Sequence, residues 1–261
     1  MSMPVSYTKY LLFISFILFS SSIFANANKP DSLKQVDSLK KELQLTVSDS
    51  LKGPLYTQIA SEYLKFDTIS NKKERLVYQE EVLKNTLLAL RNYSRYGDTT
   101  GLRISFNNLA YVYHAQKKYS QAKWFILQSN TLSRMKNDSV NIIASLIELA
   151  SIKKDIKDFK LALRDLKEAQ QISAKNHYAR QQSEVQLGYA LLYTSMKNPA
   201  KAAIALKRHR AIDDSIKKAE EIALVAKEHS LDSVQLVKKK VYMISNKRIS
   251  RLSSSRRLVS L

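Results

Sequence analysis

The sequence predicts an all-α fold, a right-handed solenoid of antiparallel helix pairs between an N-terminal signal helix and a C-terminal extension helix. Two observations favour it. The 261 residues include only four glycines and four prolines, with no proline between Leu55 and Asn198, whereas sheet-rich chains need many turn residues. Small residues recur with a period of forty residues. No cysteine is present, so stability must come from packing and not from disulfides.

Residues 1–27 are predicted to form an export signal. Lys9 and the α-amino group give a weakly positive start, Tyr10–Phe19 is apolar, and Ala25–Ala27 has the small-x-small pattern of a cleavage site. The apolar stretch is short for a membrane span, which needs about 20 residues. We therefore expect an exported, periplasmic chain. Anchoring in the inner membrane by an uncleaved signal is the alternative.

Residues 28–54 are predicted to be an N-terminal helix and a linker. The helix is expected over Asp31–Leu45, which is amphipathic, and Gly53-Pro54 is expected to end this segment. Residues 55–64 and 74–98 follow as a degenerate helix pair, with an extra loop near residues 66–72. The repeats are expected to fill residues 55–215 as about four pairs, clearest at 103–136, 143–176 and 183–212.

The forty-residue period is carried by alanines. Shifting the chain by forty residues superimposes two sets, Ala110 with Ala150 and Ala190, and Ala122 with Ala162 and Ala202. A small side chain lets two helix backbones approach closely, and larger neighbours such as Tyr113 and Tyr119 fill the space beside the contact. We therefore expect these alanines to be buried where the two helices of a pair cross.

The expected turns carry capping residues. Gly97 before Asp98, and the pair Asn137-Asp138 forty residues later, are suited to ending one helix and capping the next. Asn198 is predicted to be an N-cap, with Pro199 at the first helical position. After the repeats, residues 216–240 are expected to form a C-terminal helix, and residues 241–261 a disordered basic tail.

The pattern resembles the tetratricopeptide repeat (TPR) family, in a long-period exported form. That family has large-x-x-Leu-Gly/Ala-x-x-Tyr in its first helix and Ala-x-x-x-Phe-x-x-Ala in its second. The first copy matches at Phe106, Leu109, Ala110, Tyr113, Ala122, Ile126 and Ser129. The second matches at Leu146, Leu149, Ala150, Ala162, Leu166 and Ala169, and the third at Ala190, Tyr193, Ala202 and Leu206. The period exceeds the family's usual ~34 residues, so longer helices are expected.

The resemblance implies a concave groove, lined by the first helix of each pair, that holds a peptide or a partner protein. The positions of this sequence that correspond to groove-facing places are Asn107, Tyr111, His114, Ser151, Lys154, Leu191 and Thr194. An ordinary solvated helix face is the alternative for these residues. The paired Lys and Asn residues with which some members bind a peptide carboxylate are not reproduced, so capture of peptide C-termini is not expected in this groove.

The sequence offers no catalytic, metal or cofactor site, and a non-enzymatic role is expected. The four histidines, His114, His177, His209 and His229, share no metal-ligand spacing. The glycines never cluster into a phosphate-binding loop, and no nucleophile elbow occurs.

The net charge of +20 is concentrated toward the C-terminus, where eight basic residues and no acidic residue follow Ser233. A solvated terminus is the simplest interpretation. Contact with an anionic membrane surface through this tail is a further candidate interaction, and nucleic acid is not expected as the partner of an exported chain.

Two functions remain open. The first is an exported, non-enzymatic TPR scaffold that binds a protein or peptide. The second is the extracytoplasmic input module of a truncated membrane signalling regulator, of the histidine kinase or helix-turn-helix type. An export signal followed by a long-period repeat array and a charged helix resembles such regulators. The identity of the partner is not encoded in any motif.

Overall fold

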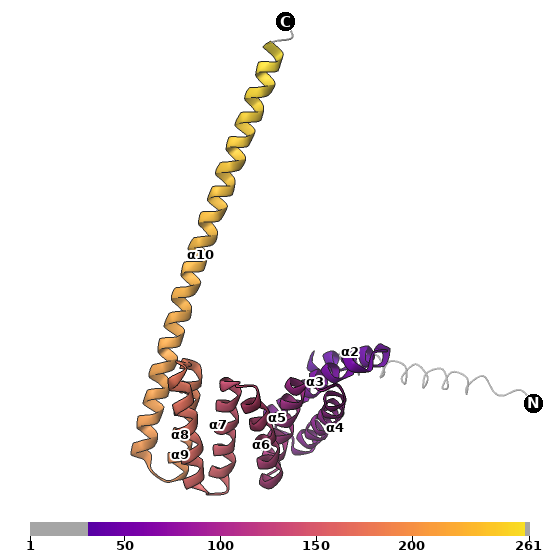
Figure 1. The fold of residues 1–261 in the computed structure, drawn as a ribbon, viewed down its shortest axis with the longest axis vertical. Coiled ribbons are helices and arrows are strands. Elements are labelled where there is room, and N and C mark those ends of the chain that lie inside the picture. Colours follow the sequence, from indigo (N-terminus) through magenta and orange to yellow (C-terminus); the bar gives the residue numbers. More distant parts are fainter. Residues whose placement is uncertain (1–30, 259–261) are drawn as a thin grey trace, which may run out of the picture. The chain divides into compact units, whose positions relative to one another are not determined.

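A computed structural model of the chain describes residues 31–258, without the side chains of residues 31–33 and of most residues after Lys227. Throughout this range the secondary structure is helical and no strand occurs (Figure 1). Neighbouring helices along the chain pack on one another, so the predicted all-α solenoid of successive helix pairs is confirmed. The predicted export signal lies outside the described residues.

The central helices follow a strict twenty-residue step. Five consecutive helices have 17 residues each: α5 (Thr99–Ala115), α6 (Tyr119–Met135), α7 (Ser139–Asp155), α8 (Phe159–Lys175) and α9 (Ala179–Ser195). Three residues separate each helix from the next. The forty-residue sequence period is thus two identical helix-plus-turn steps, and its excess over ~34 residues lengthens both helices.

The same backbone turn closes every step. The residue in the left-handed region is Gly97 at the end of α4, and then Lys117, Asn137, Lys157, His177 and Lys197, with φ between 53° and 67°. One residue further on, an amide donates back to the carbonyl five residues earlier, as from Asp98 to Tyr93 at 3.0 Å. This is the Schellman arrangement, which satisfies carbonyls left free at a helix end.

Most of these turns also cap the following helix. The Asp98 carboxylate accepts from the amides of Thr100 and Gly101, both at 3.0 Å. Asp138 accepts from the Asn141 amide at 3.1 Å, and Asn198 from the Lys201 amide at 3.1 Å. The predicted turns at residues 97–98, 137–138 and 198–199 are therefore confirmed, because local hydrogen bonding alone specifies them.

The chain forms two compact units that divide within α8, after Ala169. The first unit starts with α2 (Asp31–Leu45), the short 3₁₀ helix η1 (Asp49–Leu51) and α3 (Lys52–Tyr63). A second 3₁₀ helix, η2 (Leu64–Thr68), lies in the predicted extra loop and leads to α4 (Lys72–Tyr96). These elements are followed by α5, α6, α7 and the first part of α8.

Gly53-Pro54 does not end the N-terminal segment as the sequence suggested. Both residues lie in the first turn of α3, where a proline is tolerated because the first amides of a helix have no partner. Gly53 is buried against α4, and its amide donates to the Asn92 side chain at 3.1 Å. An added Cβ would stand 2.6 Å from that Asn92 oxygen, so the glycine permits a close helix approach and does not break a helix.

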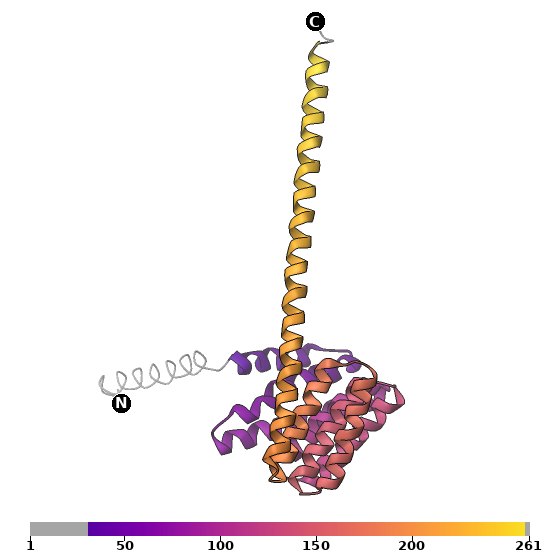
Figure 2. The ribbon, with the colours of Figure 1, turned by 90° about the vertical axis from the view of Figure 1, so that its left-hand side faces the viewer.

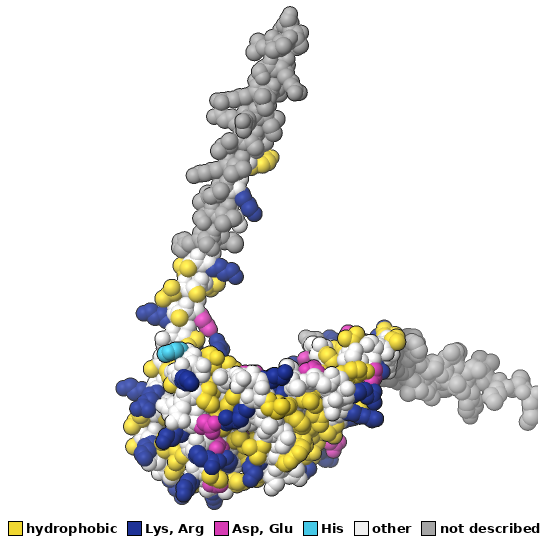
Figure 3. Space-filling view, in the orientation of Figure 1, with side chains coloured by type: hydrophobic (Ala, Val, Ile, Leu, Met, Phe, Trp, Pro, Cys, Tyr) yellow, Lys and Arg dark blue, Asp and Glu magenta, His cyan; other side chains and the backbone are white. Residues whose placement is uncertain are grey.

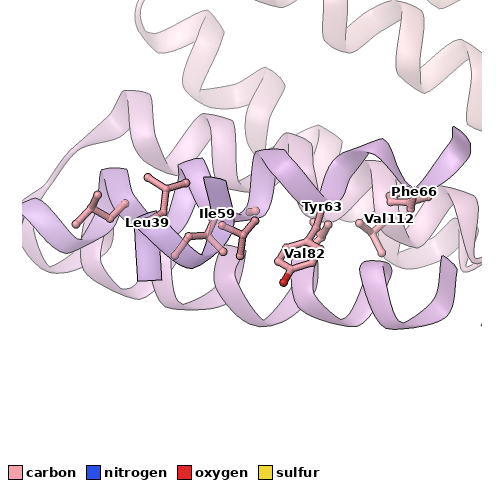
Figure 4. Close-up of a cluster of buried hydrophobic side chains, with 9 residues drawn as sticks. Leu39, Ile59, Tyr63, Phe66, Val82 and Val112 are labelled. Atoms are coloured by element: carbon pink, nitrogen blue, oxygen red, sulfur yellow. The ribbon is translucent and has the colours of Figure 1, made fainter. Parts of the chain in front are cut away.

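The first unit has two buried apolar clusters. One joins α2, α3, η2, α4 and α5 around Ile59 and Phe66, which are both fully buried (Figure 4). The other joins α5, α6 and α7 and contains Ala110, Ala122, Ile126, Leu149 and Ile152. The alanines are therefore at the helix crossings, as predicted.

The second unit consists of the end of α8, α9 and a single long helix, α10 (Pro199–Leu258). Ala190 is buried in it, but Ala202 is only half-buried and Ala205 takes the buried place. The sequence predicted a repeat ending near residue 215, a separate helix at 216–240 and a disordered tail beyond it. Instead one helix runs through all three segments, as both ribbon views show (Figure 2).

The amino-acid composition explains why α10 continues without a break. No glycine or proline follows Pro199, so nothing interrupts the backbone hydrogen bonds of α10. From Lys217 to Lys227 every side chain is exposed, including Ile222, Leu224 and Val225. Apolar and charged side chains lie next to one another on this stretch of α10 (Figure 3).

Candidate functional site

The structure places three predicted groove residues close together on α5. Asn107 and His114 are half-buried, and Tyr111 is exposed. All three lie on the side of α5 that faces η2 and α7, because their contacts run to residues of these two elements. Helical spacing accounts for the alignment, since residues three, four and seven apart lie on one face.

His114 is held between two carboxylates of α7. Its Nδ1 lies 2.8 Å from Glu148 Oε1, and its Nε2 lies 2.8 Å from Asp155 Oδ2. The hydrogen bond to Glu148 is the largest cause of a raised His114 pKa; the bond to Asp155 adds to it, and partial burial opposes it. His114 therefore carries a positive charge at a higher pH than an ordinary histidine and links α5 to α7.

Tyr111 is tied to the segment before α4. Its hydroxyl donates to the Asp67 carboxylate of η2, and its ring packs on Phe66 with centroids 5.2 Å apart. Burial, followed by the bond to Asp67, raises the pKa of Tyr111, so the phenol remains neutral. The tyrosine is thus oriented before any ligand arrives, which lowers the entropic cost of binding.

A hollow of about 240 Å³ adjoins these residues in the first unit. It is lined by Leu64 of η2, Asn107, Asn108 and Tyr111 of α5, Ile126 of α6, and Ala144 and Glu148 of α7. Asn107 lines this hollow, and its Oδ1 atom is buried and has no hydrogen-bond partner within the described residues. An amide offers both a donor and an acceptor, which matches the peptide backbone.

The remaining predicted residues fall into two places. On α7, Ser151 is half-buried, and Lys154 forms an ion pair with Asp155 at 3.2 Å, so Lys154 joins the same cluster as His114. On α9, Leu191 is 52% exposed and the Thr194 hydroxyl donates to the Ala190 carbonyl at 2.9 Å. Leu191 and Thr194 belong to the second unit, whereas the other five belong to the first.

Sequence reasoning missed the acidic partners Asp67, Glu148 and Asp155, and also Asn108. Asp67 is 44 residues before Tyr111, so no local pattern connects the two. Glu148 could have been found from the sequence. It stands forty residues after Asn108, so the period puts it at the same place in the next helix pair.

The second unit contains a serine, a histidine and an aspartate in contact. The Ser183 hydroxyl donates to the Asp213 carboxylate and lies 2.7 Å from His209 Nδ1. Ser183 is only 2% exposed, so its hydroxyl is not presented to a substrate. The three side chains instead connect α9 to α10. Among the described residues, no cluster of three or more His, Asp or Glu side chains has the geometry of a metal site.

Comparison with known proteins supports the fold only. The chain matches no family model. No curated protein is similar to it in sequence. A crystal structure of BtubC (BKLC) from P. vanneervenii is similar, with a TM-score of 0.59 over 82% of this chain and 88% of that chain. The sequences are 15% identical, so the similarity establishes a shared helical-repeat fold and not a shared activity.

Within the described range, none of the helices combines the length and apolar character that crossing a membrane requires.

Proposed function

We propose that the chain is an exported, non-enzymatic scaffold of the TPR type that binds a peptide or a segment of a partner protein on the face of α5 and α7. The observation that carries the proposal is the hollow lined by Asn107, Asn108 and Tyr111, which brings two side-chain amides and an aromatic ring to one surface. The helix pairs with alanines at their crossings support the TPR assignment.

The chemistry of this surface fits an extended peptide. Asn107 and Asn108 can donate to and accept from a peptide backbone, and Tyr111 offers an exposed ring for a side chain. His114, held between Glu148 and Asp155, keeps α5 and α7 at a fixed separation. A fixed surface loses little freedom on binding, so a few contacts suffice for measurable affinity.

Affinity capture from a periplasmic extract tests the proposal. The wild-type chain is compared with the combined variant Asn107→Ala, Tyr111→Ala and His114→Ala, each at equal load after circular dichroism has established equal helicity. A matched control carries Lys160→Ala, Lys167→Ala and Gln171→Ala, at three exposed positions of α8. We expect one partner to be recovered by wild type and control and lost from the α5 variant. Equal recovery by all three proteins, or no recovery above background, would refute the proposal.

The continuity of α10 favours a second candidate, the sensory input module. This helix begins in the pair with α9 and continues to Leu258 without a break, so a shift of the pair would be transmitted along it. Because the chain has no cysteine, a double variant with cysteines at Leu187 and Lys227, both exposed positions, can carry one spin label at each. A change in their distance when the captured partner is added would support this role, and an unchanged distance would contradict it.

A further inference from the structure

A second hollow lies in the second unit, between α8, α9 and α10. Its volume is about 250 Å³. The side chains that determine its chemistry are Tyr189 and Tyr193 of α9, and Lys201, Ala205 and Arg208 of α10. The two tyrosine rings are stacked, with centroids 6.0 Å apart and an interplanar angle of 16°. None of the predicted groove residues lines this hollow.

The forty-residue register explains why the space is open. Tyr193 and Ala205 correspond to Tyr113 and Phe125 in the first pair, where the two rings stack with centroids 5.4 Å apart and planes within 3°. They correspond to Lys153 and Asp165 in the second pair, which form a buried ion pair. In the third pair Ala205 supplies neither a ring nor a carboxylate, and a hollow remains beside Tyr193.

The charged residues that line the hollow are all basic. Lys201 and Arg208 are its charged residues, and no Asp or Glu lines the hollow. The Lys201 ammonium lies 5.7 Å from the centre of the Tyr193 ring, so a cation already stands above the aromatic wall. Arg208 lies about two turns after Lys201 on α10 and can donate two parallel hydrogen bonds to a carboxylate.

Tyr189 remains neutral in this setting. Burial, with the neighbouring Tyr193 as a smaller cause, raises the pKa of Tyr189 to about 12. A protonated phenol does not repel an anion, and its hydroxyl can donate to one.

We propose that this hollow binds an aromatic group that carries a carboxylate. The ring packs beside Tyr193, in the place that Phe125 fills in the first pair, and Lys201 and Arg208 pair with the carboxylate. The hollow is lined by residues of the second unit and the α5–α7 face belongs to the first, so this proposal neither requires nor replaces the binding proposed for that face. A peptide ending in phenylalanine and a free aryl carboxylate present the same chemistry.

Ligand-observed NMR with three probes that share one ring tests the charge requirement. Phenylacetate, phenylacetamide and 2-phenylethylamine are titrated into the full chain. We expect phenylacetate to bind at least about tenfold more tightly than phenylacetamide, because the carboxylate adds charge-assisted hydrogen bonds, and phenylethylamine to show no saturation. Equal binding of phenylacetate and phenylacetamide, or binding of none of the three, would overturn the proposal.

Three variants locate the site. Arg208→Gln should weaken phenylacetate binding at least about fivefold, whereas the control Arg210→Gln, an exposed position on the same helix outside the hollow, should not. Ala205→Phe should fill the hollow as Phe125 does, abolishing binding without lowering the melting temperature. Retained binding in folded Ala205→Phe, or an equal loss in Arg210→Gln, would refute it.

Two further measurements distinguish a peptide end from a small aryl carboxylate, and this hollow from the α5–α7 face. Tighter binding of N-acetyl-Ala-Ala-Phe with a free carboxylate than of phenylacetate assigns the site to peptide ends, and the reverse order assigns it to small aryl carboxylates. The variant Asn107→Ala, Tyr111→Ala and His114→Ala should bind phenylacetate as the wild type does. Loss of phenylacetate binding in that variant would contradict an independent second site.

Discussion

The α5–α6 pair and the α7–α8 pair have the same backbone but fill the same position differently. In the first pair Tyr113 stacks on Phe125, and in the second Lys153 forms an ion pair with Asp165. The side chains of Lys153 and Asp165 are 9% and 4% exposed, so the ion pair is almost fully removed from water. The helix lengths and the turns are unchanged between the two pairs.

The comparison shows that the repeat determines the backbone, whereas the side chains that pack between the two helices of a pair can differ. What must be kept is a small residue at the crossing, as Ala110 and Ala150 show, and a left-handed residue at each turn. A stacked ring pair and a buried ion pair then stabilise the same geometry, although they differ in how they respond to the loss of one partner.

The largest expected effect comes from breaking the ion pair. Asp165→Ala should lower the free energy of unfolding by about 3–5 kcal/mol, because it leaves the buried Lys153 ammonium without a partner. Replacing both residues by apolar ones, as in Lys153→Met with Asp165→Leu, should restore most of that stability. Urea unfolding followed by circular dichroism measures both.

The surface pair Arg134–Glu168, 2.6 Å apart and with side chains 45% and 41% exposed, is the matched control. Glu168→Ala should cost less than about 1 kcal/mol, because solvent screens an exposed pair. If Asp165→Ala cost no more than Glu168→Ala, the ion pair would not be the element that replaces the aromatic stack.

The next prediction compares how two equally buried alanines tolerate a larger side chain. Ala150 and Ala205 are each 4% exposed, and Ala205 borders the hollow of the second unit. Ala150→Leu should destabilise by about 1–3 kcal/mol through overpacking, whereas Ala205→Leu should cost less than about 1 kcal/mol. Thermal unfolding of both variants measures the difference, and equal costs would show that the third pair is packed as tightly as the second.

The link between α5 and α7 should depend on pH. Because the hydrogen bonds to Glu148 and Asp155 raise the folded-state pKa of His114, its contribution is fully present below the unfolded-state pKa. The contribution is lost as pH rises through the folded-state pKa. His114→Gln should therefore lose more stability at pH 5.5 than at pH 9, as measured by urea unfolding at both. An NMR titration giving a His114 pKa at or below its ordinary value would contradict this.

The smallest effect concerns the turns. Lys117, Lys157 and Lys197 adopt the left-handed conformation that Gly97 adopts without a steric penalty. Lys157→Gly should stabilise the chain by on the order of 0.5–1 kcal/mol, after the entropy that glycine adds to the unfolded chain is subtracted. Gly97→Ala should have the opposite sign. The melting temperatures of both variants check it, and a destabilising Lys157→Gly would mean that the lysine side chain itself stabilises the turn.

Local rules predict much of this fold from the order of the residues. Helix content, the period, the burial of Ala110, Ala150 and Ala190 and the caps at Asp98, Asp138 and Asn198 were all predicted. Each depends on residues within a turn or two of one another, or on a spacing that repeats. The left-handed conformation of Lys117, Lys157, His177 and Lys197 was not predicted, because these residue types give no sign of it.

The sequence alone therefore determined that helices would form, where three of their turns would lie and which small residues would lie between them, because capping and periodicity act over a few residues. Only the tertiary structure decided which side chains meet. Asp67 reaches Tyr111 and Glu148 reaches His114 across 44 and 34 residues, and a hollow opens beside Tyr193. These contacts arise from packing one helix on another, which brings together residues that no local pattern relates.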